Sequence, residues 1–190
     1  MPDAERQSAQ EILVAGLRNA HAMERQAVAV LETQTRRLRD YPDFETRVFR
    51  HVQESRIQAE RLENALRRCD AAPSSLKGVA MSAMGLWQST AQLFADDAPV
   101  KAMLADTMFE HFEIAAYRSL LEIASLAGRD ELRPDLEASL REEEAMARWL
   151  EENLTAVTRR YVARAQGTGT SAPAAAPQQA AAPGPGAGAA

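Results

Sequence analysis

Several glutamates in this sequence occupy positions where the apolar stripe of a long helix would ordinarily carry leucine. The stripe of the first helical segment is Leu13, Leu17, Ala20, Glu24, Ala27 and Leu31. That of the last is Leu136, Leu140, Glu143, Ala147, Leu150, Leu154, Val157 and Tyr161. Steps of three and four residues place each set on one helix face. Because burial of an unpartnered carboxylate costs several kcal/mol or forces its protonation, these glutamates require a shared partner, and a bound metal ion is the partner we favour.

Two further helical segments contribute oxygen donors to the same interior. The segment from about residue 42 to 69 carries Glu54 and Gln58, and the segment from about 99 to 127 carries Glu110 and Glu113. Glu110, Glu113 and Tyr117 lie at i, i+3 and i+7 and can share a face, although the spacing does not settle which glutamate points inward. The candidate metal ligands are Glu24, Glu54, Gln58, Glu110, Glu113 and Glu143.

The candidate ligand set consists of carboxylates and one amide oxygen. Such a hard set suits Mn or Fe(II) and disfavours Zn or Cu, so two ions of Fe or Mn are the expected cofactor, bridged by carboxylates. We interpret His51 as an inward or interfacial histidine in preference to a ligand. Gln58 is either a ligand or a hydrogen-bond partner of a carboxylate or backbone carbonyl. Tyr117 is interpreted as a buried tyrosine bonded to a carboxylate.

The elements that must position these residues are helical. Leu, Ala, Glu and Arg dominate the 190 residues, and no alternating run of β-branched residues indicates a strand. Turn signals separate helices predicted at about 4–39, 42–69, 76–94, 99–127 and 134–164. The expected fold is all-α: a ferritin-like antiparallel four-helix bundle with an additional short helix, residues 76–94, in the crossover. Residues 1–166 form this domain, and the Ala/Pro/Gly-rich residues 167–190 are expected to be a disordered tail.

Composition narrows the classes of function. The net charge is −5 and basic residues are spread along every segment, which disfavours a nucleic-acid partner. No apolar run approaches the roughly 20 residues that span a bilayer, and the N-terminal stretch MPDAERQSAQ lacks the apolar core of a signal peptide. We therefore expect no membrane partner and a cytoplasmic location. Cys69 is the single cysteine and is interpreted as a small buried apolar residue.

The chain resembles the YciF-like family of the ferritin-like superfamily in four segments: NAHAMERQAVAVLETQ, HVQESRIQAERLE, EHFEIAAYRSLLEIA and LREEEAMARWLEENL. The second and third are the most specific, and their shared residues are His51, Glu54, Gln58, Glu63, Glu110, His111, Glu113, Ile114 and Tyr117. The resemblance covers roughly residues 8–164. It implies a five-helix ferritin-like fold, dimerisation, metal binding within the bundle and an association with bacterial stress responses.

The histidines typical of ferritin-like metal sites are absent from their usual places. Ferritin-like di-metal proteins place one inward glutamate on each of two helices and a Glu-x-x-His pair on each of the other two. Here Ile57 and Met146 stand three residues after Glu54 and Glu143, where histidines would be expected. The family that the chain resembles also lacks these histidines, so their absence is a family trait. The resemblance implies no reaction.

Two functions compete on these grounds. The leading hypothesis is a metal-binding protein of the bacterial stress response that oxidises Fe(II) or reduces a small oxidant such as peroxide or O2, and whether it is an enzyme stays open. The alternative is a non-enzymatic dimeric scaffold or binding module whose inward glutamates are protonated or paired with arginines. Storage of a mineral core is a weaker hypothesis, because it needs a hollow shell. A homodimer is the expected assembly.

Overall fold

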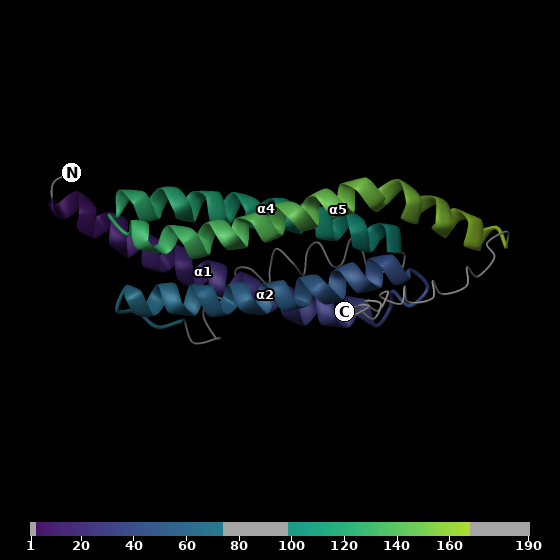
Figure 1. Ribbon diagram of the computed structural model, residues 1–190, viewed down its shortest axis with the longest axis horizontal. Coiled ribbons are helices and arrows are strands. Elements are labelled where there is room, and N and C mark those ends of the chain that lie inside the picture. Colours follow the sequence, from purple (N-terminus) through teal and green to yellow (C-terminus); the bar gives the residue numbers. More distant parts are fainter. Residues whose placement is uncertain (1–2, 74–98, 168–190) are drawn as a thin grey trace, which may run out of the picture.

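Four long helices form the structure, a computed structural model that describes residues 3–73 and 99–167 (Figure 1). They are α1 (Asp3–Thr35), α2 (Pro42–Arg68), α4 (Pro99–Leu126) and α5 (Arg133–Ala165), and a short 3-10 helix, η1 (Asp130–Leu132), precedes α5. The prediction of an all-α fold is confirmed. The short helix predicted at 76–94 lies outside the described residues, as does the tail beyond residue 167.

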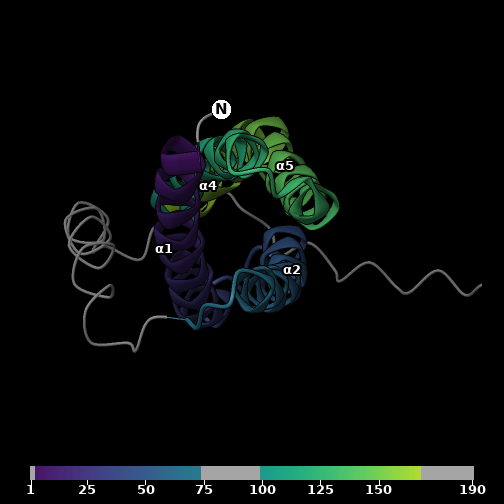
Figure 2. The ribbon, with the colours of Figure 1, turned by 90° about the vertical axis from the view of Figure 1, so that its left-hand side faces the viewer.

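The helices pack as two antiparallel hairpins, α1 with α2 and α4 with α5 (Figure 1). Seen end-on, they follow the order α1, α4, α5, α2 around the bundle axis (Figure 2), and each helix contacts its two neighbours in this order. α2 and α4 run in the same direction, as a bundle of two hairpins joined by a crossover requires. All four helices therefore present one face to a shared interior.

Turns between the helices follow ordinary sequence signals. Pro42 stands at the start of α2, where its missing N–H is not needed. After α4, Gly128 adopts a φ of +68°, a backbone conformation that favours glycine, and the chain turns there into η1. α1 ends at Thr35, earlier than the predicted end near residue 39, because the chain turns at this point and buries Leu38.

Each helix carries an inward seam whose members alternate by three and four positions. The seam of α2 is Phe44, Val48, His51, Ser55, Gln58, Leu62 and Ala65. That of α4 is Met103, Asp106, Glu110, Glu113, Tyr117, Leu120 and Ala124. Glu24 and Glu143 are fully buried, as their spacing predicted. Tyr161 was predicted on the α5 seam but is 39% exposed, because the last turns of α5 extend beyond the other helices (Figure 1).

Two apolar clusters fill the interior on either side of a polar region. The first includes Leu13, Leu17, Leu62, Leu66, Leu120 and Leu136. The second includes Leu31, Phe44, Val48, Met103, Met146 and Leu150. Cys69 is buried in the first cluster as a free thiol, which confirms its interpretation as a small apolar residue. Along the seams between the clusters lie the buried residues that we call the polar midsection: Glu24, His51, Ser55, Gln58, Asp106, Glu110, Glu113, Ser139 and Glu143.

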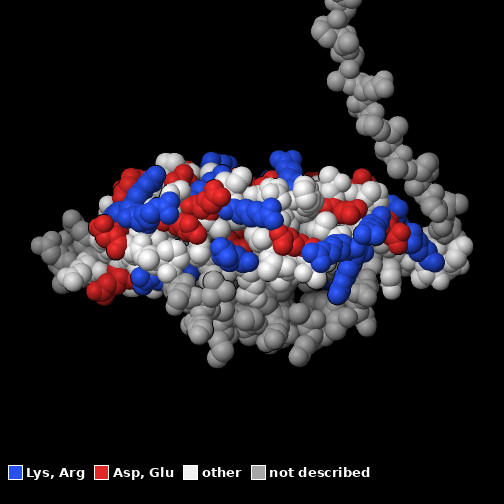
Figure 3. Space-filling view, turned by 90° about the horizontal axis from the view of Figure 1, so that it is seen from below, with Lys and Arg blue, Asp and Glu red and all other residues white. Residues whose placement is uncertain are grey.

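The outer surface carries interspersed charges of both signs. On the face shown in Figure 3, Lys and Arg atoms are intermixed with Asp and Glu atoms over the described helices. Some of these charges pair across helices, as Arg118 does with Glu144 at 2.7 Å. Exposed pairs of this kind contribute about 0–1 kcal/mol each, so the interior decides the stability of the bundle. Within residues 3–73 and 99–167, no helix combines the length and apolar character needed to cross a membrane.

Candidate metal centre

Four buried side chains meet in the polar midsection: His51 of α2, Glu110 and Glu113 of α4, and Glu143 of α5. One ligand atom from each of them lies within 4.8 Å of the others. His51 Nε2 is 3.2 Å from Glu110 Oε2 and 3.4 Å from Glu143 Oε2. One imidazole nitrogen and three carboxylates at this separation can hold a metal ion. We refer to these residues as the four-residue cluster.

Both candidate glutamates of α4 point into the bundle. The sequence left open which of the two is inward, and the structure buries Glu110 and Glu113 alike, at 1% and 0% exposure. Steps of four and three residues from Asp106 keep all three side chains on the same face of α4. Two of the four candidate ligands therefore come from one helix, one turn apart.

Oxygen atoms in this region are buried without a hydrogen-bond partner among the described residues. Both carboxylate oxygens of Glu113 and of Glu143 are in this state, and so are one oxygen each of Glu24, Gln58 and Glu110. Two of these atoms, Glu110 Oε2 and Glu143 Oε2, lie within ion-pair distance of His51 Nε2. A buried polar atom that makes no hydrogen bond costs roughly 1–3 kcal/mol, and a charged one costs more. A cation at this place would interact with several of these oxygens at once, so the residues present fit a metal ion.

His51 is held by Glu54 on the side facing away from the cluster. The His51 Nδ1 lies 3.1 Å from Glu54 Oε2, and Arg47 and Arg50 each donate to the same carboxylate at 3.0 Å. Burial alone would raise the pKa of Glu54, but the bond with His51 and the charge of Arg47 lower it to about 2. An ionised Glu54 accepts the Nδ1 proton, which leaves Nε2 free to face Glu110 and Glu143. The structure thus places Glu54 behind His51 and outside the four-residue cluster.

Glu24 of α1 is engaged through one of its two oxygens. The Tyr117 hydroxyl donates to Glu24 Oε1 at 2.6 Å, and both side chains are fully buried. This confirms the interpretation of Tyr117 as a buried tyrosine bonded to a carboxylate. Burial and the negative charge of Glu143 raise the pKa of Glu24 well above its usual range. Glu24 Oε2 has no partner in the described part of the chain and remains available to a cation.

Gln58 is fixed in one orientation by residues outside the midsection. Its Nε2 donates to Glu142 Oε2 at 3.0 Å, and Arg61 holds the Glu142 carboxylate with two bonds of 2.6 and 3.0 Å. Because the amide nitrogen is engaged, the amide oxygen is the atom left over, and it is buried without a partner in the described structure. Gln58 therefore bonds a carboxylate, as predicted for a hydrogen-bond partner. Its amide oxygen also stays available, as a metal ligand would require.

The carboxylates of the midsection oppose one another's ionisation. Burial, together with neighbouring glutamates, raises the pKa of Glu113 well above its usual range and that of Glu110 to about 8. Burial would lower the pKa of His51, but the charge of Glu110 and the contacts with Glu110, Glu143 and Glu54 together outweigh it, so the pKa is raised well above its usual range. Burial would raise the pKa of Glu143, but contact with His51 lowers it. Without a metal, the cluster therefore keeps protons that a cation would displace.

The sequence matches the family described as Domain of unknown function (DUF892) over residues 8–163. The chain belongs to the DUF892 family. Its structure is similar to that of a protein from Xanthomonas campestris pv. campestris, with a TM-score of 0.72 and 29% identity over 84% of this chain and 99% of the other. It is also similar in fold to YcfI from Rhodopseudomonas palustris, whose description proposes a structural role, with a TM-score of 0.67 and 24% identity over 80% of this chain and 98% of that one.

Sequence reasoning understated His51 and missed Ser55, Asp106 and Ser139. All four are buried polar residues on inward seams. The signal for His51 and Ser55 was present in the α2 spacing, because both fall on the series of alternating threes and fours that also contains Gln58. Asp106 stands one turn before Glu110 on the same face of α4. Serine and aspartate are frequent on solvent-exposed positions, so residue type alone gave no reason to select them.

Proposed function

We propose that this DUF892 protein binds two divalent ions, Fe or Mn, in the polar midsection and uses them in a bacterial stress response to oxidise Fe(II) or reduce peroxide or O2. The observation that carries the proposal is the set of buried oxygens without hydrogen-bond partners, contributed by all four described long helices. Oxygen donors with a single imidazole suit Fe(II) and Mn(II) better than Zn or Cu.

Charge balance supports two ions in preference to one. Glu24, Glu110, Glu113 and Glu143 would together carry four negative charges when ionised, and a neutral His51 adds none. Two divalent ions would match this charge, whereas one ion would leave an excess of negative charge in a buried region. The four-residue cluster would hold the first ion. Glu24 Oε2 and Gln58 Oε1 would hold the second, together with the remaining oxygens of Glu113 and Glu143.

The residues around the centre have separable tasks. Glu54, ionised by its arginine partners, orients His51, and Tyr117 orients Glu24. Gln58 is turned so that its oxygen faces the interior. The two apolar clusters on either side limit the access of water along the bundle axis. When bound, a pair of reduced ions would together supply the two electrons that convert one H2O2 and two protons into two water molecules.

Metal analysis tests this proposal. Protein purified without an affinity tag or chelator should contain about two Fe or Mn per chain, and Glu143→Gln should lose them because Glu143 would be a ligand of both ions. Glu144→Gln is the matched control, since Glu144 is the next residue on α5 and pairs with Arg118 at the surface. Wild-type protein that contains no metal and takes up none on anaerobic addition of Fe(II) or Mn(II) would contradict the proposal.

The second candidate is a non-enzymatic scaffold or binding module. It is supported by the protons that burial retains on Glu24, Glu110 and Glu113, because a protonated carboxyl group needs no cation. The description of YcfI as structural agrees with it. A bundle that resists heating equally with and without added metal, and that consumes no peroxide, would favour the scaffold.

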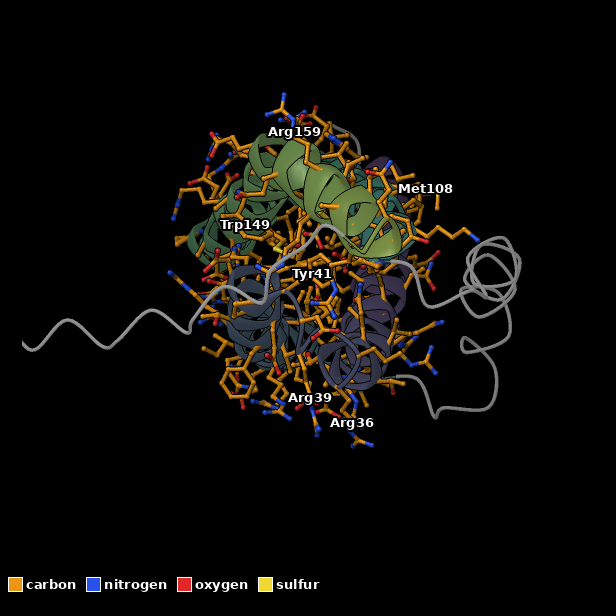
Figure 4. All side chains as sticks on the ribbon, turned by 90° about the vertical axis from the view of Figure 1, so that its right-hand side faces the viewer. Arg36, Arg39, Tyr41, Met108, Trp149 and Arg159 are labelled. Atoms are coloured by element: carbon orange, nitrogen blue, oxygen red, sulfur yellow. The ribbon has the colours of Figure 1, made fainter. Side chains whose placement is uncertain are left out.

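Both candidate functions, the metal-binding protein and the scaffold, include a homodimer as the expected assembly. Apolar side chains form an exposed stripe on α4, with Leu104, Met108 and Phe112 each between 45% and 49% exposed. They are four residues apart and so lie along one side of the helix, and Met108 projects away from the bundle (Figure 4). We propose that a second copy covers this stripe. Sedimentation equilibrium should give the mass of two chains, and a monomer at all concentrations would exclude the dimer.

A further inference from the structure

The hydroxyl group of Ser55 is buried without a hydrogen-bond partner among the described residues. Ser55 is 0% exposed, and its Oγ makes no hydrogen bond. It stands on the α2 seam, four residues after His51 and three before Gln58. Both of these neighbours belong to the polar midsection, so Ser55 faces the same interior. Neither the sequence prediction nor the four-residue cluster includes it.

Hydroxyl groups on the helices of this protein usually bond their own backbone. Four threonines donate to the carbonyl oxygen four residues earlier, at 2.8–3.1 Å: Thr33, Thr35, Thr107 and Thr158. A serine within a helix can do the same. Ser55 does not, although the carbonyl of His51 is in the corresponding position. Its donor is therefore not used by the fold in the described structure.

The other donors of the midsection are already engaged. His51 Nδ1, the Tyr117 hydroxyl and Gln58 Nε2 each bond a glutamate, and the Ser139 oxygen accepts a hydrogen bond from Arg61 at 3.3 Å. Ionised carboxylates accept hydrogen bonds and cannot donate them. Ser55 thus supplies the midsection with a hydrogen-bond donor that is not committed to a group of the described protein.

We infer that Ser55 donates a hydrogen bond to a small anionic ligand, such as hydroperoxide or hydroxide, that enters the metal centre. The inference rests on the proposed metal site, because an anion would not approach four carboxylates without cations. It adds a binding group for the oxidant that the metal ligands cannot provide. The ligand must be small, since four helices and two apolar clusters enclose the midsection. A buried donor without an acceptor, such as the Ser55 hydroxyl, costs folding free energy in the metal-free protein. An anion bound in the metal-loaded centre would accept its hydrogen bond and remove that cost.

Azide binding to the Co(II)-loaded protein tests the inference, with azide as the small anion and the visible spectrum of Co(II) as the signal. Ser55→Ala should bind Co(II) with the wild-type stoichiometry and bind azide about tenfold more weakly, the effect of losing one hydrogen bond to a charged acceptor. Ser119→Ala, a substitution at an exposed serine of α4, should bind azide as wild type does. In the metal-free protein, Ser55→Ala should keep or raise the melting temperature, because no bond is lost.

The contrary outcomes separate this inference from the proposed function. Equal azide affinity in Ser55→Ala at full Co(II) content would overturn the role of Ser55 and leave the metal centre intact. A fall in the melting temperature of metal-free Ser55→Ala would mean that the fold does use the hydroxyl, and loss of Co(II) would make Ser55 a ligand. Either result overturns the inference. Wild-type protein that takes up no Co(II) would overturn the metal centre and the inference together.

Discussion

Replacing Asp106 with asparagine should remove a pH-dependent weakness from the bundle. Asp106 is 2% exposed, lies one turn before Glu110 on α4, and accepts a hydrogen bond from Gln34 Nε2 at 2.9 Å. Burial raises its pKa from an ordinary 3.8 to about 7, although the Gln34 bond and the charge of His51 oppose the rise. The folded protein therefore keeps this carboxyl group protonated at pH values where the unfolded chain has already ionised it.

The sign and size of the effect follow from proton linkage. Between the two pKa values the folded state binds one proton more than the unfolded state, so the free energy of unfolding falls by about 1.4 kcal/mol per pH unit as pH rises. The stabilisation by the proton is complete below about pH 4 and is largely lost at about pH 7, and the loss between about pH 5 and pH 7 amounts to about 2 kcal/mol. Asparagine does not titrate, and its side-chain oxygen can accept the same bond from Gln34.

Urea unfolding of metal-free protein, followed by circular dichroism from about pH 5 to about pH 8, measures this difference. The contributions of groups that titrate in both proteins to the free energy of unfolding largely cancel when Asp106→Asn is compared with wild type. The variant should gain stability relative to wild type up to about pH 7, and the difference should then level off. Asp130→Asn, a substitution at an exposed position of η1, is the matched control. An Asp106→Asn curve that is parallel to wild type throughout, or lies below it at about pH 8, would refute the assignment of a buried proton to Asp106.

Two further substitutions test the groups that orient the centre. Glu54→Gln should weaken Mn(II) binding by roughly 10–100-fold with an unchanged number of ions, because it removes the carboxylate that holds His51 and no ligand; isothermal titration measures both quantities, and loss of a bound ion would make Glu54 a ligand. Tyr117→Phe should lower the free energy of unfolding of the metal-free protein by roughly 1–3 kcal/mol, because Glu24 Oε1 loses its buried donor; unchanged stability in urea would contradict that role.

The helices and most inward positions could be predicted because the pattern is continuous. Alternating steps of three and four residues identified the buried faces that carry Glu24 and Glu143, and turn residues such as Gly128 identified helix ends. The end of α1 was wrong by several residues because nothing local distinguishes a helical turn from the turn that buries Leu38. The predicted inward position of Tyr161 was wrong, because the periodic pattern of α5 continues past the point where the helix loses its neighbours.

The position of Glu54 shows where sequence reasoning about the site failed to separate two alternatives. His51 and Glu54 are three residues apart and share part of a helix face, but only His51 falls on the seam series. Glu54 is displaced from Ser55 by about 100° around the helix, toward Arg47 and Arg50, which bind it. The seam spacing of alternating threes and fours favoured His51 as the inward residue, whereas residue chemistry and the family resemblance favoured Glu54 as a metal ligand. Metal titration of Glu54→Gln separates the two possible roles of Glu54, hydrogen-bond partner of His51 or metal ligand.

The arrangement of the interior implies that metal binding would add to the stability of the fold and would not create the fold. The two apolar clusters contain buried side chains from all four described long helices, so the hairpins are held together on both sides of the polar midsection. Protons retained on Glu110 and its neighbours reduce the repulsion among carboxylates in the metal-free protein. Binding to the folded state alone would then raise stability by about 2.7 kcal/mol at a metal concentration 100 times the Kd. A fold that persists without metal could lose and regain its ions without unfolding.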